Sequence, residues 1–367
     1  MLDTDVFVIG GGPAGLAAAI AARRKGLRAT VADGSRPPID KACGEGLMPD
    51  AIAAAERIGI GLPEGEGFRF RGICFHGEGR SVAGQFPGGF GIGFRRTALH
   101  GHLVKLAAKA GVEMLWSTPV TGIDSAAVQT TARRFSTRWI VGADGFRSRV
   151  RRWAGLDSFA RNSQRFAYRR HFAVKPWTGF MEIYWGDACQ IYVTPVSDEE
   201  VCVALISRTP AMRLPQGLQR FPDLQARLHT ALPSSKERGS VTATSRLRAV
   251  SRESVALIGD ASGSVDAITG EGLCQAFQQA EALAEGLSAG SLAHYEARHR
   301  QIAFRPALMA DLMLTMDRWP LARRHALSAM AAHPQSFAGL LAGHVGRLTP
   351  WQMAGAGLSL GWQMMVK

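Results

Sequence analysis

The start of the chain alternates apolar runs with a glycine turn, in an order that predicts strand, helix and strand. Apolar residues dominate Asp5–Ile9, alanine dominates Leu16–Lys25, and a second apolar run covers Leu27–Asp33. The turn GGGPAG stands between the first strand and the helix. This order predicts one Rossmann-like β-α-β unit at the N-terminus.

The remaining pattern predicts a β-rich middle between helical segments. Short strands are expected within residues 67–84, and a strand-turn-strand over 112–141. Longer strands are expected at Phe166–Val174, Phe180–Trp185, Gln190–Val196, Val201–Ser207 and Val255–Ile258. Helices are expected at Pro49–Ile58, Thr97–Ala110, Leu273–Leu287 and within residues 291–367.

Composition narrows the class of protein to a globular enzyme. The chain has 367 residues, 46% of them hydrophobic, and a formal charge of +13 that is carried mainly by dispersed arginines. Because these arginines form no basic block, we expect no nucleic-acid partner. Five cysteines without a C-x-x-C pair or a Cys/His cluster predict a reduced, cytoplasmic protein with no metal site.

The C-terminal stretch Trp351–Val366 contains no charged residue but is too short for a membrane span. Gly355, Gly357 and Gly361 would weaken an isolated interfacial helix, which favours a helix packed on the body of the protein. A peripheral membrane contact stays open as the alternative.

A glycine fingerprint follows the first predicted strand, and an acidic residue ends the second. The glycines would permit a tight turn, close approach of a pyrophosphate and close packing of helix on strand. The acid would accept hydrogen bonds from a ribose. The expected dinucleotide-binding residues are Gly10, Gly12, Pro13, Ala14, Gly15 and Asp33. This motif alone does not distinguish FAD from NAD.

A second segment makes that distinction. VALIGDASGSVDAITGEG, residues 255–272, resembles the distal FAD segment of the flavoprotein monooxygenase and geranylgeranyl reductase superfamily. The resemblance implies that Gly259 and Asp260 contact the ribityl or pyrophosphate region. Gly270 and Gly272 would let the N-terminus of the next helix approach the flavin, where its dipole favours negative charge. The implied cofactor is FAD.

Three further segments resemble the same superfamily. GADGFRS is similar to its DG motif, which implies that Asp144 contacts FAD, although Asp144 could instead cap the next helix. Arg96 matches the position where an arginine before a helix reaches the cofactor. DKACGEG resembles the K-x-C-G-x-G segment of the reductase branch and implies that Cys43 and Gly44 lie near the flavin.

The resemblance covers residues 3 to about 290 and implies an α/β fold. We expect a Rossmann-like FAD-binding domain of the glutathione-reductase-like type, an inserted antiparallel β-sheet substrate domain and C-terminal helices. The expected boundaries are 1–66, 97–160 and 250–300 for the FAD-binding domain, 67–96 and 161–249 for the substrate domain, and 301–367 for the helical region. Without a second glycine fingerprint, NAD(P)H is expected to dock only transiently.

The substrate region separates the branches of the superfamily. Gln190–Val196 keeps only the proline of the Tyr-x-Trp-x-Phe-Pro-Lys run of the lipid reductases, and the segment reads more like flavin hydroxylases. The absent halogenase signature W-x-W-x-I-P argues against a halogenase. We therefore expect an NAD(P)H-dependent monooxygenase that hydroxylates a small hydrophobic aromatic, polyketide or isoprenoid-like substrate. Cys43, Tyr192 and His171 are the catalytic candidates.

Two alternatives remain open at this point. One is geranylgeranyl reductase-like reduction of the double bonds of a prenyl lipid by the same reduced flavin. The other is a flavin-binding protein without turnover of its own, which acts as an electron-transfer partner.

Overall fold

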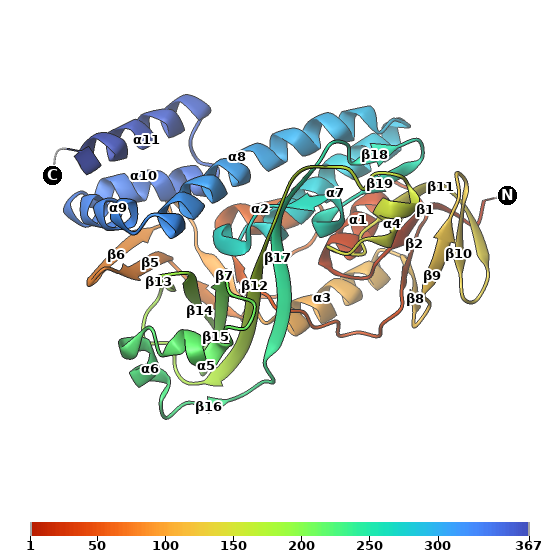
Figure 1. Cartoon of the computed structure of the whole chain (residues 1–367). Coiled ribbons are helices and arrows are strands. Elements are labelled where there is room, and N and C mark those ends of the chain that lie inside the picture. The colour runs from red at the N-terminus through yellow and green to blue at the C-terminus, as the bar shows by residue number, and fades with distance from the viewer. Residues whose placement is uncertain (1, 366–367) are drawn as a thin grey trace.

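The first sheet carries the N-terminal β-α-β unit. The computed structural model describes residues 2–365, and Figure 1 shows this sheet on the side of the molecule that holds the N-terminus. The strand order is β18-β19-β11-β1-β2-β8, with β10 and β9 attached to β11. The strands are β1 (Thr4–Ile9), β2 (Ala29–Asp33), β8 (Glu113–Trp116), β9 (Val120–Ile123), β10 (Ala127–Thr130), β11 (Arg134–Gly142), β18 (Ser251–Arg252) and β19 (Val255–Leu257). The central strands pair in parallel and are buried, as their continuous apolar runs predict.

Helices pack on this sheet through small side chains. They are α1 (Pro13–Arg24), α2 (Pro49–Arg57), α3 (Arg96–Lys109), α4 (Arg149–Trp153) and α7 (Gly272–Ala289). Helix α1 contacts both α3 and α7, and its alanines from Ala17 to Ala22 are buried. Gly15 permits the close approach, because a Cβ there would lie 1.9 Å from the carbonyl oxygen of Gly10.

The second sheet has the strand order β20-β17-β12-β15-β14-β13-β5-β6, and β16 pairs with β12. Its strands are β5 (Gly72–Gly77), β6 (Arg80–Gln85), β12 (Phe159–Ala173), β13 (Met181–Gly186), β14 (Cys189–Ser197), β15 (Glu200–Ser207), β16 (Leu232–Pro233), β17 (Arg238–Leu247) and β20 (Gly263–Ser264). Neighbouring strands run antiparallel except β13 and β5, which run parallel. The sheet is therefore mixed, not purely antiparallel as expected. A small third sheet joins β3 (Gly46–Leu47), β7 (Gly91–Gly93) and β4 (Phe68–Phe70).

Several elements of the second sheet were not expected from the sequence. β12 begins at Phe159 rather than Phe166, and β17 pairs with it along most of its length. The β17 sequence, RGSVTATSRL, alternates polar residues with small or apolar ones, but only Val241 and Leu247 are large apolar residues, so the pattern is a weak strand signal. The short helices α5 (Leu214–Leu218) and α6 (Pro222–Leu228) pack on this sheet in the polar, proline-containing stretch.

The expected helical C-terminus is confirmed within the described residues, and residues 366 and 367 lie outside them. It consists of α8 (Ala293–Arg318), α9 (Pro320–Ala332), α10 (Pro334–His344) and α11 (Pro350–Met365). The last three each begin with proline, whose fixed φ and missing N–H suit the first helical turn. Figure 1 shows α9, α10 and α11 at the end of the molecule away from the N-terminus, where α9 and α10 pack on β6, and it shows α8 running toward them along the top of the molecule. None of the helices within residues 2–365 is long and apolar enough to cross a membrane.

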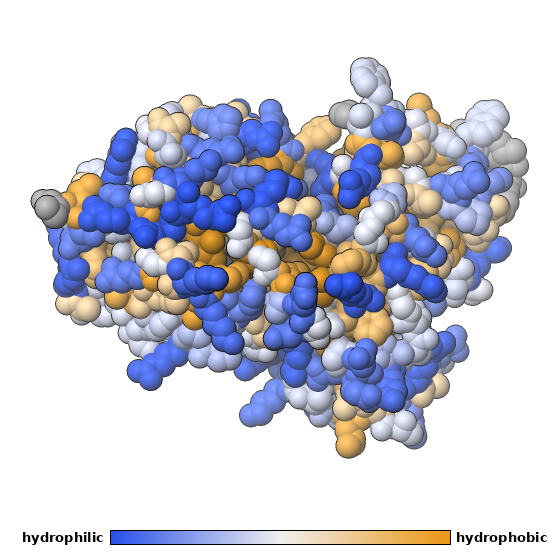
Figure 2. All heavy atoms as spheres, turned by 180° about the vertical axis from the view of Figure 1, so that it is seen from behind, coloured by the Kyte–Doolittle hydropathy of each residue, from blue (hydrophilic) through white to orange (hydrophobic). Residues whose placement is uncertain are grey.

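Figure 2 shows the face opposite to the view of Figure 1. Hydrophilic residues cover most of it, and hydrophobic residues gather in a recessed band across its middle. Most strands of the second sheet come from residues 67–96 and 161–249, but β20 comes from the segment expected in the FAD-binding domain, and the domain boundaries stay predictions.

Candidate active site

A cavity of about 1110 Å³ lies between the two sheets. Its first side is formed by the loops that follow the parallel strands β1, β2, β11 and β19. Its other side is formed by residues of β12, β14, β15 and β17. Ligands of open parallel sheets bind outside the carboxyl ends of the strands, and this cavity is in that position.

The glycine turn at the end of β1 opens into the cavity. Gly10 has φ +114°, and a Cβ there would meet the carbonyl oxygen of Ala143 at 2.4 Å, so the turn lies directly on the chain after β11. A Cβ on Gly12 would meet nothing within 4 Å, so this residue faces open space at the N-terminus of α1. The Gly11 amide donates to Asp33 Oδ2 at 2.8 Å, which fixes the turn against the end of β2.

His100 supports the same turn from α3. Its Nε2 donates to the Gly11 carbonyl oxygen at 2.8 Å. Burial lowers the pKa of His100, so the ring stays neutral at neutral pH. Only the folded chain brings α3 beside the glycine turn, and this contact left no signal in the sequence.

The distal segment approaches the cavity from the other side. Asp260 lies in η1 (Gly259–Ser262) and forms a 2.7 Å ion pair with Lys41. Burial would raise the pKa of Asp260, but Lys41 and then Arg96 outweigh it, and the pKa is lowered. Gly270 has φ +69°, a left-handed conformation that ends η2 (Ala267–Thr269) one turn before α7.

Asp144 and Arg96 line the cavity, and each has one buried polar side-chain atom without a hydrogen-bond partner among the described residues. Asp144 Oδ2 accepts from the Arg149 amide at 2.7 Å, so Asp144 does cap α4, as the alternative interpretation held. Its other oxygen, Oδ1, is buried and has no partner among residues 2–365, and the same holds for Arg96 Nε. Both residues line the cavity. A buried polar atom without a partner is costly, so these atoms indicate a polar ligand.

These features fit FAD. Gly12, Gly44 and Gly272 all face open space where a Cβ would meet nothing within 4 Å. Two helix N-termini, of α1 and α7, present backbone N–H groups at this cavity. With Asp33 and Asp260 at its ends, the cradle has the glycine approaches and polar groups that a dinucleotide requires.

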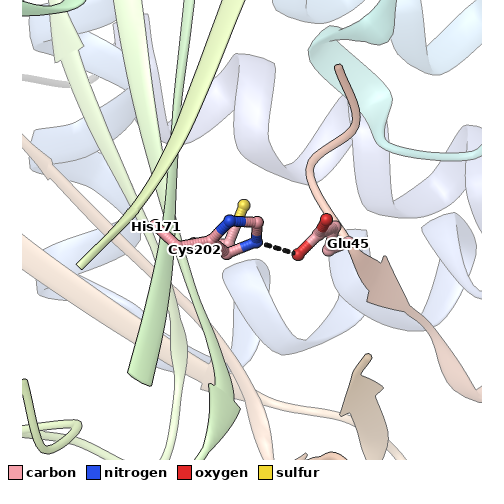
Figure 3. A group of neighbouring side chains, drawn as sticks. All are labelled: Glu45, His171 and Cys202. Carbon is pink, nitrogen blue, oxygen red and sulfur yellow. Dashed lines mark hydrogen bonds and ion pairs between the residues drawn. The ribbon is translucent and has the colours of Figure 1, made fainter. Parts of the chain in front are cut away.

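A buried carboxylate–imidazole pair lies beside this cradle (Figure 3). Glu45 lines the cavity, and its side chain is fully buried. Its Oε2 is 2.6 Å from His171 Nε2, and its Oε1 accepts from the Arg96 amide at 3.1 Å. Arg169 Nε lies 3.7 Å from Oε1. Glu45 has φ +60°, a conformation that costs a non-glycine residue energy and is found where the surrounding contacts enforce it.

The partners of His171 settle which nitrogen carries the proton. Its Nδ1 faces Arg169 Nη1 at 3.2 Å and Arg95 Nη2 at 3.3 Å, and Ser235 Oγ lies 2.8 Å away. A guanidinium only donates hydrogen bonds, so Nδ1 accepts and the proton is on Nε2. Nε2–H then donates to Glu45, and every polar contact of this carboxylate is a donor or a cation.

Cys202 completes a trio with Glu45 and His171, whose ligand atoms lie within 4.8 Å of one another. Burial raises the pKa of the Cys202 thiol well above its usual range, which disfavours the thiolate that binds metals. The Arg169 cation also lies against the carboxylate. The geometry therefore supports a hydrogen-bonded network better than a metal centre.

The three catalytic candidates from the sequence occupy different places. Cys43 lines the cavity in the loop before Glu45. His171 does not line it and reaches it through Glu45. Tyr192 lines the cavity, but its hydroxyl donates to the Ile268 carbonyl oxygen at 2.8 Å and burial raises its pKa, so it ties β14 to η2.

Most of the expected cofactor residues line one cavity. They are Gly10, Gly12, Pro13, Ala14, Asp33, Cys43, Gly44, Arg96, Asp144, Gly259, Asp260, Gly270 and Gly272. Gly15 is the exception, since it serves the packing of α1. The sequence did not single out Lys41 or Arg169. Lys41 stands in the DKACGEG loop and could have been found there, whereas Arg169 lies in an ordinary strand.

An apolar cleft adjoins the cavity under the C-terminal helices. It has a volume of about 60 Å³ and shares Met48 and Met181 with the cavity. Its other walls come from β5 and β13 on one side and from α8, α9, α10 and α11 on the other. Methionine side chains are flexible and adapt to apolar ligands of different shape.

Comparison with known proteins identifies the family. A family model described as FAD binding domain matches residues 3–292. Menaquinone reductase of Mycobacterium tuberculosis (strain ATCC 25618 / H37Rv) is 28% identical over 336 residues, with 84% of this chain and 80% of that protein covered. Digeranylgeranylglycerophospholipid reductase of Thermoplasma volcanium is 29% identical over 303 residues, with 74% of each chain covered.

Among solved structures, the flavin-dependent brominase Bmp2 superposes with a TM-score of 0.81 at 18% identity and covers 98% of this chain and 99% of its own. At this identity the similarity concerns the fold alone. The family match covers most of the chain and coincides with the cavity that fits FAD. This chain is therefore an FAD-dependent oxidoreductase that belongs to the FAD binding domain family.

Proposed function

We propose that this chain is an NAD(P)H-dependent monooxygenase that hydroxylates an aromatic ring bearing a hydroxyl group and a long apolar chain. The observation that carries the proposal is the Glu45–His171 pair at the cavity wall. Every contact of Glu45 donates a hydrogen bond to it or carries positive charge, which favours the carboxylate form from which a general base acts. Removing the proton of an aromatic hydroxyl makes the ring electron-rich, as hydroxylation requires.

Bound FAD would supply the redox chemistry, by passing electrons from NAD(P)H to oxygen. The chain's own residues have simpler tasks. Lys41, Arg96 and the N-terminus of α7 provide positive potential for the cofactor. Glu45 accepts the substrate proton, and His171 holds the carboxylate in place. The apolar wall at Met48 and Met181 excludes water from the ring.

The chemistry of the two spaces supports the substrate class. Beyond the cofactor cradle, the cavity continues along β14 and β15 past Ala204 and Ile206. The methionine-lined cleft adjoins it and accommodates an aliphatic chain in preference to a polar one. A phenol or polyketide ring with an alkyl or isoprenoid tail matches this combination.

Reduction of isoprenoid double bonds is the second candidate. It is supported by the names of the two relatives, both of which are reductases, and by the Cys43 loop. An alkene reduction consumes a proton at the substrate, whereas the donors around Glu45 favour its carboxylate form, which has no proton to give. For this reason we rank it second.

The experiment is turnover with NADPH or NADH and a panel of alkylated phenols, prenylated phenols and prenyl lipids, with and without oxygen. For a monooxygenase we expect oxygen consumption that depends on the substrate, and a product heavier by one oxygen atom. Turnover of a prenyl lipid in the absence of oxygen would overturn the proposal in favour of the reductase. Matched reactions without NAD(P)H and without substrate serve as controls.

A further inference from the structure

The end of the chain, from Arg318 onward, carries positive charge and no acidic residue of its own. Asp317 is the last Asp or Glu of the chain, and residues 318–367 contain none. Arg318, Arg324 and Arg347 are exposed, and none of them has an ion-pair partner among residues 2–365. This end of the molecule therefore presents unpaired cations to the solvent.

Helix α11 presents an apolar face to the solvent, and Arg347 lies three residues before its first residue. Its sequence, PWQMAGAGLSLGWQMM, has no ionisable residue. Trp351, Leu358 and Trp362 are 87%, 77% and 66% exposed, and their spacing of seven and four residues puts them on one side of the helix. Leu360 lies on the other side and is buried. An exposed apolar stripe on an uncharged helix requires a partner.

Helix α8 carries a second exposed apolar stripe. Phe304, Leu308 and Leu312 follow one another at intervals of four residues and are all exposed. Leu312 also lines the apolar cleft, and Leu360 lines it from α11. The cleft thus reaches the surface at Leu312 beside the stripe of α8 and lies under the buried side of α11 at Leu360, and its inner end adjoins the cavity at Met48 and Met181.

We propose that α8 and α11 form a docking surface for an anionic lipid bilayer. The occupant follows from the chemistry of the surface. Tryptophan favours the boundary between headgroups and acyl chains, and arginine is attracted to anionic headgroups. A second copy of the chain would bring the unpaired arginines of two molecules together without an acidic residue in residues 318–367 to balance them.

Docking in this orientation places the mouth of the cleft at the bilayer. An apolar substrate then reaches the cavity from the membrane without crossing water. This second step rests on the proposed function, whereas the docking itself does not depend on the reaction.

The test is flotation of the FAD-loaded enzyme with vesicles. One set contains phosphatidylcholine alone, and the other also contains phosphatidylglycerol. We expect binding to the anionic vesicles that weakens with salt, and little binding to the neutral ones. Leu358→Ser should weaken this binding about tenfold or more, and Arg347→Gln about fivefold.

The control is Leu232→Ser. Leu232 is 74% exposed, like Leu358, but it lies on β16, at the opposite edge of the molecule from α11 in Figure 1. It should bind vesicles as the unchanged enzyme does. NAD(P)H-driven reduction of the bound flavin, measured without vesicles, should be the same in all three variants.

Three results would overturn the docking surface. The first is an enzyme that floats with neither vesicle, and the second is equal loss of binding in Leu358→Ser and Leu232→Ser. The third is a dimer in solution that Leu358→Ser dissociates, because it would make this face an interface between copies. In each case the hydroxylation of a detergent-dispersed substrate would still test the proposed function separately.

Discussion

Replacing Gly12 by alanine should separate cofactor binding from folding. Gly12 has φ −73° and ψ 177°, which any residue adopts, and the added Cβ would meet nothing within 4 Å. Alanine lowers the chain entropy of the unfolded state, which stabilises the folded protein by about 0.4–1 kcal/mol. The weaker preference for alanine at a helix N-cap offsets this. The free energy of unfolding of the apoprotein should therefore stay within about 1 kcal/mol of its original value.

The same methyl group would occupy the space through which a pyrophosphate approaches α1. Loss of one hydrogen bond between a backbone amide and a charged phosphate costs about 1.5–3 kcal/mol. FAD affinity should fall by about 10- to 150-fold. Titration of the apoprotein with FAD, followed by flavin fluorescence, measures the affinity, and chemical unfolding of the same sample measures the stability.

Gly10→Ala is the contrasting variant. Its Cβ would meet the Ala143 carbonyl oxygen at 2.4 Å at φ +114°, so we expect the apoprotein itself to lose at least about 1–3 kcal/mol of stability. If Gly12→Ala leaves FAD affinity unchanged, the pyrophosphate of FAD does not bind at the N-terminus of α1 as we infer. An equal loss of stability in the two variants would contradict the same inference.

Four further variants test the remaining contacts. Glu45→Gln keeps the shape of the side chain but cannot accept the proton, so kcat should fall about 10²- to 10⁴-fold with FAD affinity unchanged; Cys202→Ser, in the same cluster, should retain turnover. Tyr192→Phe removes the hydrogen bond to Ile268 and should lower the free energy of unfolding by about 1–3 kcal/mol, while activity persists, and a loss of turnover without a loss of stability would make Tyr192 catalytic after all. Burial raises the pKa of Glu271 from 4.5 to about 8, so the folded state holds this proton more tightly than the unfolded state. Stability should therefore decline as pH rises from about 5 to about 8, and Glu271→Gln should flatten that slope in thermal unfolding curves.

The parts of the fold that the sequence predicted are those with a local cause. β1 and β2 are buried on both faces, so their apolar runs stand out, and α1 follows from the glycine turn and its alanines. β17 is held by its pairing with β12, a partner some 80 residues earlier whose position the local pattern does not reveal. The start of β12 was missed for the same reason. Residues 161–165 are polar, and the part of the strand before Phe166 pairs only with β17.

The residues of the candidate site also fall into two groups, those that a local motif predicts and those that depend on contacts between distant parts of the chain. The glycines and acids of the cradle follow one another within short motifs, and each needs only its own turn or helix end. The Glu45–His171 pair joins positions 126 residues apart and depends on how β12 lies against the DKACGEG loop. The sequence proposed His171 as a catalytic candidate, but neither its buried position behind Glu45 nor the guanidinium groups at its Nδ1 could be derived without the folded chain.

The family match stops before the C-terminal helices, and this bears on which residues select the substrate. The match ends at residue 292, and α8 begins at Ala293. The cradle for FAD lies within the matched part, whereas most side chains that close the apolar cleft come from the helices beyond it. A change of methionine or leucine in α8, α9 or α10 alters the cleft without touching a group that contacts the cofactor. If the cleft holds part of the substrate, as we propose, substitutions in these helices should change which apolar substrate is accepted and leave FAD binding unchanged.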